Sequence, residues 1–105
     1  MRNLNFKVSS QKLSKEGDFD NIVVGSKGYL QACFVFNSEW KGFAKVAVFK
    51  SNVSNEKPVK IDANGECIVP DEVTDGAYIE VKVVGKSKAG QVITTNSVSF
   101  LQSSK

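Results

Sequence analysis

Apolar and polar residues alternate along much of the chain, and this period of two indicates half-buried β-strands. The clearest examples are Leu4 to Val8 and Ala77 to Val84. In the second segment, the face expected to turn inward carries Ala77, Ile79, Val81 and Val83. No segment shows the period of about 3.6 residues that a helix of useful length requires. The pattern therefore predicts an all-β protein.

The most apolar part of the chain runs from Tyr29 to Phe49. Its first run, Tyr29 to Phe36, is apolar at both parities apart from Gln31, so we expect other structure to cover both faces of this strand. A polar segment from Asn37 to Phe43 reverses the chain, and Ala44 to Phe49 forms the returning strand.

A hairpin is predicted between the short strands Val59 to Ile61 and Glu66 to Val69. Asn64 and Gly65 lie between them, and this pair favours a type I′ turn, which needs positive φ at both central residues. Pro70 ends the second strand because it has no N–H to donate to a ladder. The residues after it predict one helical turn, with Val73 pointing inward.

The remaining segments are shorter or more polar. Ser9 to Asn21 reads as a turn-rich segment that Leu13 and Phe19 anchor to the core, and Ile22 to Val24 reads as a short strand. Further expectations are one bent strand or two strands over Gln91–Thr95 and Ser97–Leu101, and a frayed tail over Gln102–Lys105.

These segments give about seven or eight short strands with regular turn signals, so the expected fold is an antiparallel sandwich of two sheets. A small closed β-barrel is the alternative. With 105 residues and no linker, the chain is expected to form one domain over 1–105.

Charge and hydropathy argue against two kinds of partner. The net charge is +3, and the 14 basic and 11 acidic residues are interleaved, without the basic stripe and interleaved aromatic residues of a nucleic-acid surface. No apolar run approaches the length of a membrane span. One segment is purely acidic, since Ile61 to Val81 contains no basic residue and carries Asp62, Glu66, Asp71, Glu72, Asp75 and Glu80.

The sequence offers little for catalysis or for metal binding. It contains no histidine, which removes the commonest general base and the usual partner of a catalytic serine or cysteine. Cys33 and Cys67 lie among apolar residues, so we expect buried thiols, and a disulfide between facing strands stays an alternative. We therefore expect no catalytic residue, no metal site and no cofactor.

Trp40, the single tryptophan, lies beside Lys41 and Phe43 in the polar reversal. It is either an exposed anchor for a partner or a corner tryptophan folded over the end of the sandwich. Tyr78, on the less apolar parity of its strand, is open to the same two interpretations.

The order of these motifs resembles that of small phage and prophage virion proteins from low-GC Gram-positive hosts. The residues that carry the resemblance are F-V-F-N-S-E-W-K-G from Phe34 to Gly42, K-V-A-V-F from Lys45 to Phe49, G-E-C-I-V-P-D-E-V from Gly65 to Val73, and G-A-Y-I-E-V-K-V-V-G from Gly76 to Gly85, with I-T-T from Ile93 to Thr95. The similar region covers roughly Gly28 to Thr95.

The resemblance implies an immunoglobulin-like β-sandwich that belongs to a tail, baseplate or head-fibre protein. Its expected function is non-enzymatic docking to other virion subunits through loops and edge strands, with homo-oligomers possible. The expected contact residues are Trp40, Lys41, Phe43 and Tyr78. The expected location is the bacterial cytoplasm during infection and then the virion.

Longer relatives carry coiled-coil or receptor-binding regions after this module, whereas this sequence ends at Lys105. We therefore also expect that the chain is either one domain of a longer protein or a free-standing small phage protein. In the second case the alternative function is inhibition of a host defence nuclease of the CRISPR kind by occlusion. Its contact surface would be acidic, formed by Asp62, Glu66, Asp71, Glu72 and Asp75. A third interpretation is a sugar-binding sandwich.

Overall fold

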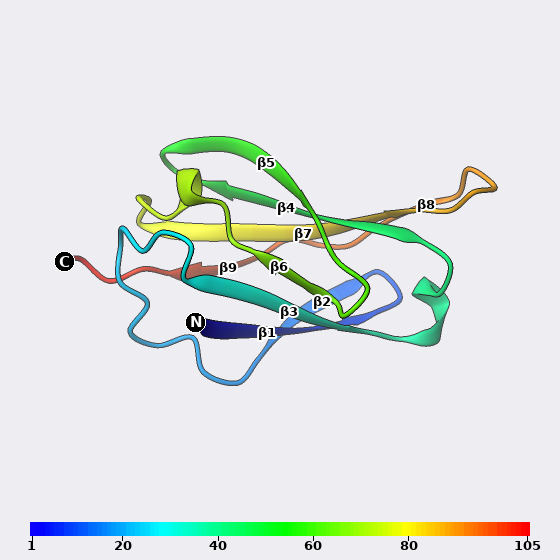
Figure 1. The fold of residues 1–105 in the computed structure, drawn as a ribbon, viewed down its shortest axis with the longest axis horizontal. Helices are drawn as coiled ribbons and strands as arrows, with labels where there is room; N and C mark the ends of the chain where they lie inside the picture. Colours follow the sequence, from blue (N-terminus) through cyan, green and yellow to red (C-terminus); the bar gives the residue numbers. More distant parts are fainter.

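The structure, a computed structural model, describes residues 1–105 and is built almost entirely from β-strands (Figure 1). The strands are β1 (Arg2–Ser9), β2 (Lys12–Glu16), β3 (Leu30–Phe36), β4 (Ala44–Ser51), β5 (Ser54–Lys60), β6 (Glu66–Ile68), β7 (Tyr78–Lys86), β8 (Val92–Thr94) and β9 (Val98–Leu101). Two single-turn 3-10 helices, η1 (Ser38–Trp40) and η2 (Asp71–Val73), lie between them.

The strands form two open sheets that pack face to face, so the predicted all-β, two-sheet sandwich is confirmed and the closed barrel is not the fold. One sheet has the order β2-β1-β3-β6, and we call it the first sheet. The second sheet has the order β5-β4-β7-β8, with β9 also paired to β7. There are nine strands, slightly more than predicted, and the β1–β3 pairing is parallel, whereas the other strand pairs are antiparallel.

The core between the sheets is made by every second residue of the long strands, as the alternation predicts. In β7 the predicted inward residues Ile79, Val81 and Val83 are fully buried. Aromatic rings in contact run through this core, with centroids 5.0–6.4 Å apart, in the order Phe19, Phe100, Phe6, Phe34, Phe36, Trp40 and Phe43. The predicted helical turn is also confirmed, with Val73 of η2 buried.

The expectation that other structure covers both faces of β3 is wrong. Leu30, Ala32 and Phe34 face the core, whereas Val35 on the opposite face is 70% exposed. Apolar residues at both parities of β3 therefore do not mean that both of its faces are buried. In a two-sheet sandwich each sheet has only one partner, so its outer face meets solvent.

The predicted hairpin of Val59–Ile61 with Glu66–Val69 is also wrong. The chain does turn at Asp62–Gly65, but β5 pairs with β4 in the second sheet and β6 pairs with β3 in the first. Gly65 has a φ of +81°, and Asn64 is not among the residues with positive φ, so this is not a type I′ turn. The Asp62 side chain shapes the turn by accepting the N–H groups of Asn64 and Glu66 (both 2.9 Å).

Three polar or short segments differ from the predictions. The polar stretch after Ser9 contains the strand β2, although Leu13 and Phe19 pack against the core as expected. Ile22–Val24 forms only one isolated bridge, between Val23 and Ser103. The tail is anchored rather than frayed at its start. Gln102 is buried, and its Nε2 donates to the carbonyl groups of Thr74 (3.1 Å) and Gly76 (2.8 Å).

Gly65 provides a test of the crossing between the sheets. Its N–H donates to the Asp62 carbonyl group (3.0 Å), its carbonyl oxygen accepts the Phe34 N–H (2.8 Å), and a Cβ on it would overlap the Phe34 carbonyl oxygen. Gly17 has the same φ of +81° with no neighbour within 4 Å. We predict that Gly17→Ala costs ~1 kcal/mol of unfolding free energy, from the left-handed backbone alone. Gly65→Ala should cost ~3 kcal/mol because an overlap is added.

Urea unfolding of the two variants beside the original chain measures both costs. Equal losses at Gly65 and Gly17 would contradict the close approach of β6 to β3.

Candidate functional site

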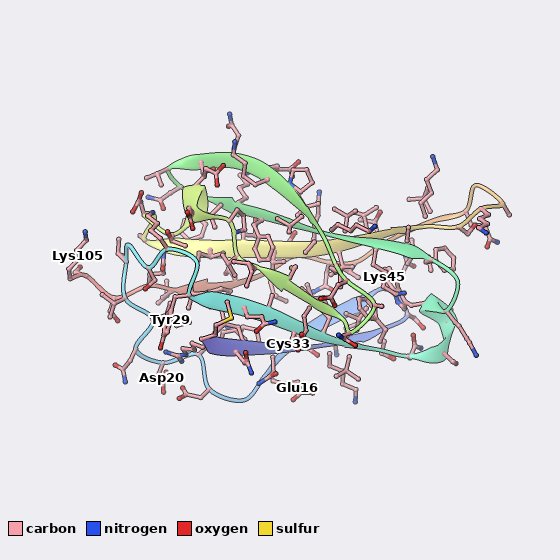
Figure 2. All side chains as sticks on the ribbon, in the orientation of Figure 1. Glu16, Asp20, Tyr29, Cys33, Lys45 and Lys105 are labelled. Atoms are coloured by element: carbon pink, nitrogen blue, oxygen red, sulfur yellow. The ribbon has the colours of Figure 1, made fainter.

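The structure buries Trp40, so its predicted role as an exposed anchor is corrected to that of a corner tryptophan. Its exposed fraction is 0%, and its indole Nε1 donates to the Ser10 carbonyl group (2.8 Å). Lys41 next to it is exposed. Phe43 is half-buried and lines a hollow at this end of the sandwich. Lys45, labelled in Figure 2, lies over the Phe36 ring and donates to the Phe43 carbonyl group (3.0 Å). These two contacts also stabilise this end of the sandwich.

Tyr78 lies at the opposite end of the molecule from Trp40. It begins β7, next to η2, whereas η1 lies at the other end of the sandwich (Figure 1). Tyr78 is half-buried and borders a polar hollow with residues of the β4–β5 turn. The four predicted contact residues therefore do not form one site.

The five acidic residues fall into two groups at the two ends of β6. Asp62 and Glu66 belong to the turn before it, and the Asp62 carboxylate is engaged there by two backbone N–H groups. Asp71, Glu72 and Asp75 follow β6 around η2. Asp71 accepts the Gly28 N–H (3.1 Å), and Asp75 forms an ion pair with Lys27 (3.0 Å).

The two cysteines are free thiols on opposite faces of the first sheet, so they do not form the disulfide considered above. Cys67 lies opposite Ala32 and faces the core, whereas Cys33 lies opposite Glu66 on the outer face. Figure 2 labels Cys33 in β3. Burial, with a smaller contribution from the Asp62 carboxylate, raises the pKa of the Cys67 thiol to about 12. Burial and then the Glu66 carboxylate raise the pKa of Cys33.

The edges of the sheets are largely closed to strand addition, although edge strands were expected to dock. Ile61 directly follows β5, and its N–H donates to the Lys45 carbonyl group of β4 (3.0 Å). Every second residue before Ile61 therefore also turns its backbone N–H and carbonyl group towards β4. Pro58 falls on the other parity, and its nitrogen, which carries no hydrogen, faces the free edge. In β6, Asp62 occupies both backbone groups of Glu66.

The edge of β2 is closed by a side chain from the link between β8 and β9. The Asn96 amide accepts the Leu13 N–H (2.8 Å) and donates to the Leu13 carbonyl group (3.1 Å), as a neighbouring strand would. Lys15 of β2 donates to the Ser99 carbonyl group on the edge of β9 (2.8 Å). These contacts restrict the addition of a further strand at these stretches of edge.

The outer face of the second sheet combines apolar and basic side chains, and we call it the valine–lysine face. Val46 of β4 lies between Lys60 of β5 and Val84 of β7 in the strand register. These residues alternate with buried ones, so they point away from the core. The face comprises Val46, Val48, Val84, Lys50, Lys60, Lys82 and Lys86.

The lysines of this face differ in how far they are neutralised. Lys82 forms an ion pair with Glu56 (3.4 Å), and Lys50 lies directly opposite Glu80. Lys60 and Lys86 are exposed and form no ion pair, and they flank the Val46–Val84 pair. The long lysine stems partly cover the valines, which are half-buried. The result is an apolar centre with a net positive rim.

The sequence alone does not reveal this face. Alternation along Ala77–Val84 puts Val84 on the outer parity, but Val46 and Val48 lie in a run that is apolar at both parities. The sequence does not show which of the two faces of β4 the other sheet covers. Apolar residues at outward positions of adjacent strands would have indicated the face.

The described side chains form no group of three or more cysteine, aspartate or glutamate residues that could hold a metal ion. None of the helical segments reaches the length and apolar character that crossing a membrane requires. Comparisons with protein-family models, with curated proteins and with solved structures give no match. The function proposed below therefore depends on the surfaces of this chain and on the sequence resemblance.

The thiols provide a test of the first sheet. At pH 8 we predict that a disulfide reagent such as DTNB modifies Cys33 more slowly than a free thiol and leaves Cys67 unmodified until the chain unfolds. Cys33→Ser should then leave no reactive thiol in the folded protein. The folded state keeps the Cys67 proton up to a pKa of about 12, against an ordinary 9.0. Stability should therefore be lost as the pH rises from 9.0 towards 12.

Rapid modification of two thiols in the folded protein would contradict the burial of Cys67. Counting modified thiols by mass spectrometry before and after addition of urea decides the outcome.

Proposed function

We propose that this chain is a non-enzymatic protein-binding module of a phage particle, and that it docks to a neighbouring subunit through the valine–lysine face. The observation that carries the proposal is the apolar centre of this face, with the unpaired Lys60 and Lys86 at its rim. Apolar side chains supply binding energy when they are desolvated, and rim charges select a partner of opposite charge.

The kind of partner follows from what the face contains. It presents aliphatic and lysine side chains flat on a sheet, and Tyr78 at the start of β7 is the one aromatic residue of this outward parity, whereas single-stranded nucleic acid is bound by stacking on successive aromatic side chains. The best fit is a protein surface with aliphatic residues surrounded by carboxylates. The resemblance of Phe34–Gly42 and Gly76–Gly85 to virion proteins supports a virion subunit as that partner, and the location proposed is the particle.

The first experiment is quantitative mass spectrometry of purified particles of the phage that encodes the chain, beside the lysate of infected cells. Copies in a fixed ratio to known particle proteins are expected. Abundance in the lysate with absence from particles would overturn the proposal and would favour the alternative function, inhibition of a host defence protein.

Charge reversal tests the face itself. We predict that Lys60→Glu combined with Lys86→Glu lowers incorporation into particles at least about tenfold, because the rim would then repel an acidic partner. The matched control is Lys7→Glu combined with Lys12→Glu. Lys7 and Lys12 are also exposed, but they lie on the outer face of the first sheet.

All four lysines are exposed, so both double variants should keep the thermal midpoint of the original chain within a few degrees. Equal incorporation of the two variants would contradict docking through the valine–lysine face.

A further inference from the structure

One end of the sandwich carries a groove that borders the valine–lysine face, since Val92 of the groove lies directly opposite Lys86. Two hollows of about 440 and 340 Å³ adjoin there and share Glu39, Val92 and Ile93. The β7–β8 hairpin projects beyond η1 at this end (Figure 1), so the inner side of β8 is left without an opposing strand. We call this feature the end groove, lined by Ser10, Gln11, Glu39, Phe43, Gln91, Val92 and Ile93.

The groove offers apolar surface beside an unpaired backbone. Phe43 and Ile93 are half-buried and pack against the core, so they form an apolar floor. Ser87 donates to the Gln91 carbonyl group (2.9 Å), and Thr95 donates to that of Val83 (3.0 Å). The intervening Val92 therefore turns its N–H and carbonyl group away from β7, towards the free edge.

No proline, carboxylate or side-chain amide blocks the backbone of Val92 in the way that Pro58, Asp62 and Asn96 block the edges described above. Two residues further along β8, the Thr94 carbonyl group accepts a hydrogen bond from the Gln11 side-chain amide (3.2 Å). No intramolecular hydrogen bond reaches the backbone of Val92 from that side, and the Val92 side chain is 60% exposed. A donor and an acceptor at the margin of an apolar hollow match an extended chain, which supplies the complementary pair.

The charge at the groove restricts the occupant further. Glu39 is the one charged residue that lines the hollows; it is exposed and forms no ion pair. A basic side chain of the occupant would supply the missing counter-charge.

We infer that the end groove binds an extended segment of a partner protein, which adds as a short strand beside Val92. Residues two apart in a strand share one face. The segment therefore places an aliphatic side chain over Phe43 and Ile93, and a lysine or arginine two residues away towards Glu39. This would be a second surface, so that the module could join two neighbours.

The probe is a blocked five-residue peptide, TVTKT, in which valine and lysine share a face. The control peptide, TTVKT, has the same composition with these residues on opposite faces. Addition of TVTKT to the ¹⁵N-labelled chain should shift the backbone NMR signals of Phe43, Val92 and Ile93 with a dissociation constant of ~1 mM. TTVKT should bind about tenfold more weakly. Equal binding of both peptides, or shifts away from the groove, would overturn the inference.

Variants separate strand addition from a simple contact. Val92→Pro removes the outward N–H without breaking a bond to β7 and should weaken TVTKT binding about tenfold, whereas Val92→Thr keeps the N–H and should bind nearly as well. Ile68→Pro is the matched control. Ile68 is also an apolar edge residue, since its neighbour Val69 donates to the Leu30 carbonyl group and its own N–H faces outward. The Ile68→Pro variant should bind TVTKT as tightly as the original chain does.

Glu39→Gln should lower the affinity about threefold and remove most of its dependence on salt. Unchanged binding in Val92→Pro would refute strand addition, and unchanged salt dependence in Glu39→Gln would refute the choice of a basic segment. Because the single variant Lys60→Glu, on β5 at the opposite edge of the second sheet from β8, should still bind TVTKT, failure at the groove is distinguishable from failure of docking through the valine–lysine face.

Discussion

The burial of Trp40 against Gly85 is the contact on which the shape of the molecule at its η1 end depends. A Cβ at Gly85 would lie 2.6 Å from Trp40 Cζ3, so the indole needs a glycine in β7 at this point. The same ring is bonded to the Ser10 carbonyl group of the β1–β2 turn. Because Gly85 pairs with Ile93, this contact fixes the β7–β8 hairpin, η1 and the first sheet relative to one another. These are the parts that line the end groove.

Several stretches of sheet edge are blocked against pairing with another chain. Pro58 offers no N–H at the free edge of β5, the Asp62 carboxylate and N–H occupy the backbone of Glu66 in β6, and the Asn96 amide takes the place of a strand beside Leu13. Each device protects a sheet edge from unspecific pairing. The valine–lysine face and the outward backbone of Val92 remain accessible, and at Val92 the free backbone groups adjoin an apolar hollow. Such an arrangement suits a module that meets its neighbours at defined surfaces.

The fold class could be predicted from the sequence because alternation is a local property, and β7 reads correctly from its valines and isoleucine alone. Pairing could not be predicted in the same way. The turn at Gly65 is visible in the sequence, but which strands its two sides join depends on burial between distant segments. Trp40 left two interpretations open for the same reason, since its glycine partner lies far away in the chain. The outward orientation of Val46 and Val48 could not be predicted, because the packing of the other sheet decides which face of β4 is buried.

The central claim is that the valine–lysine face is covered by a partner in the assembled particle, and chemical footprinting of lysines tests it most directly. Free protein and intact particles would be acetylated under the same conditions, and modification would be counted at each lysine by mass spectrometry. The account predicts strong protection of Lys60 and Lys86 in the particle, with Lys7 and Lys12 modified equally in both samples. Equal modification of Lys60 and Lys86 in particles and in free protein would contradict it.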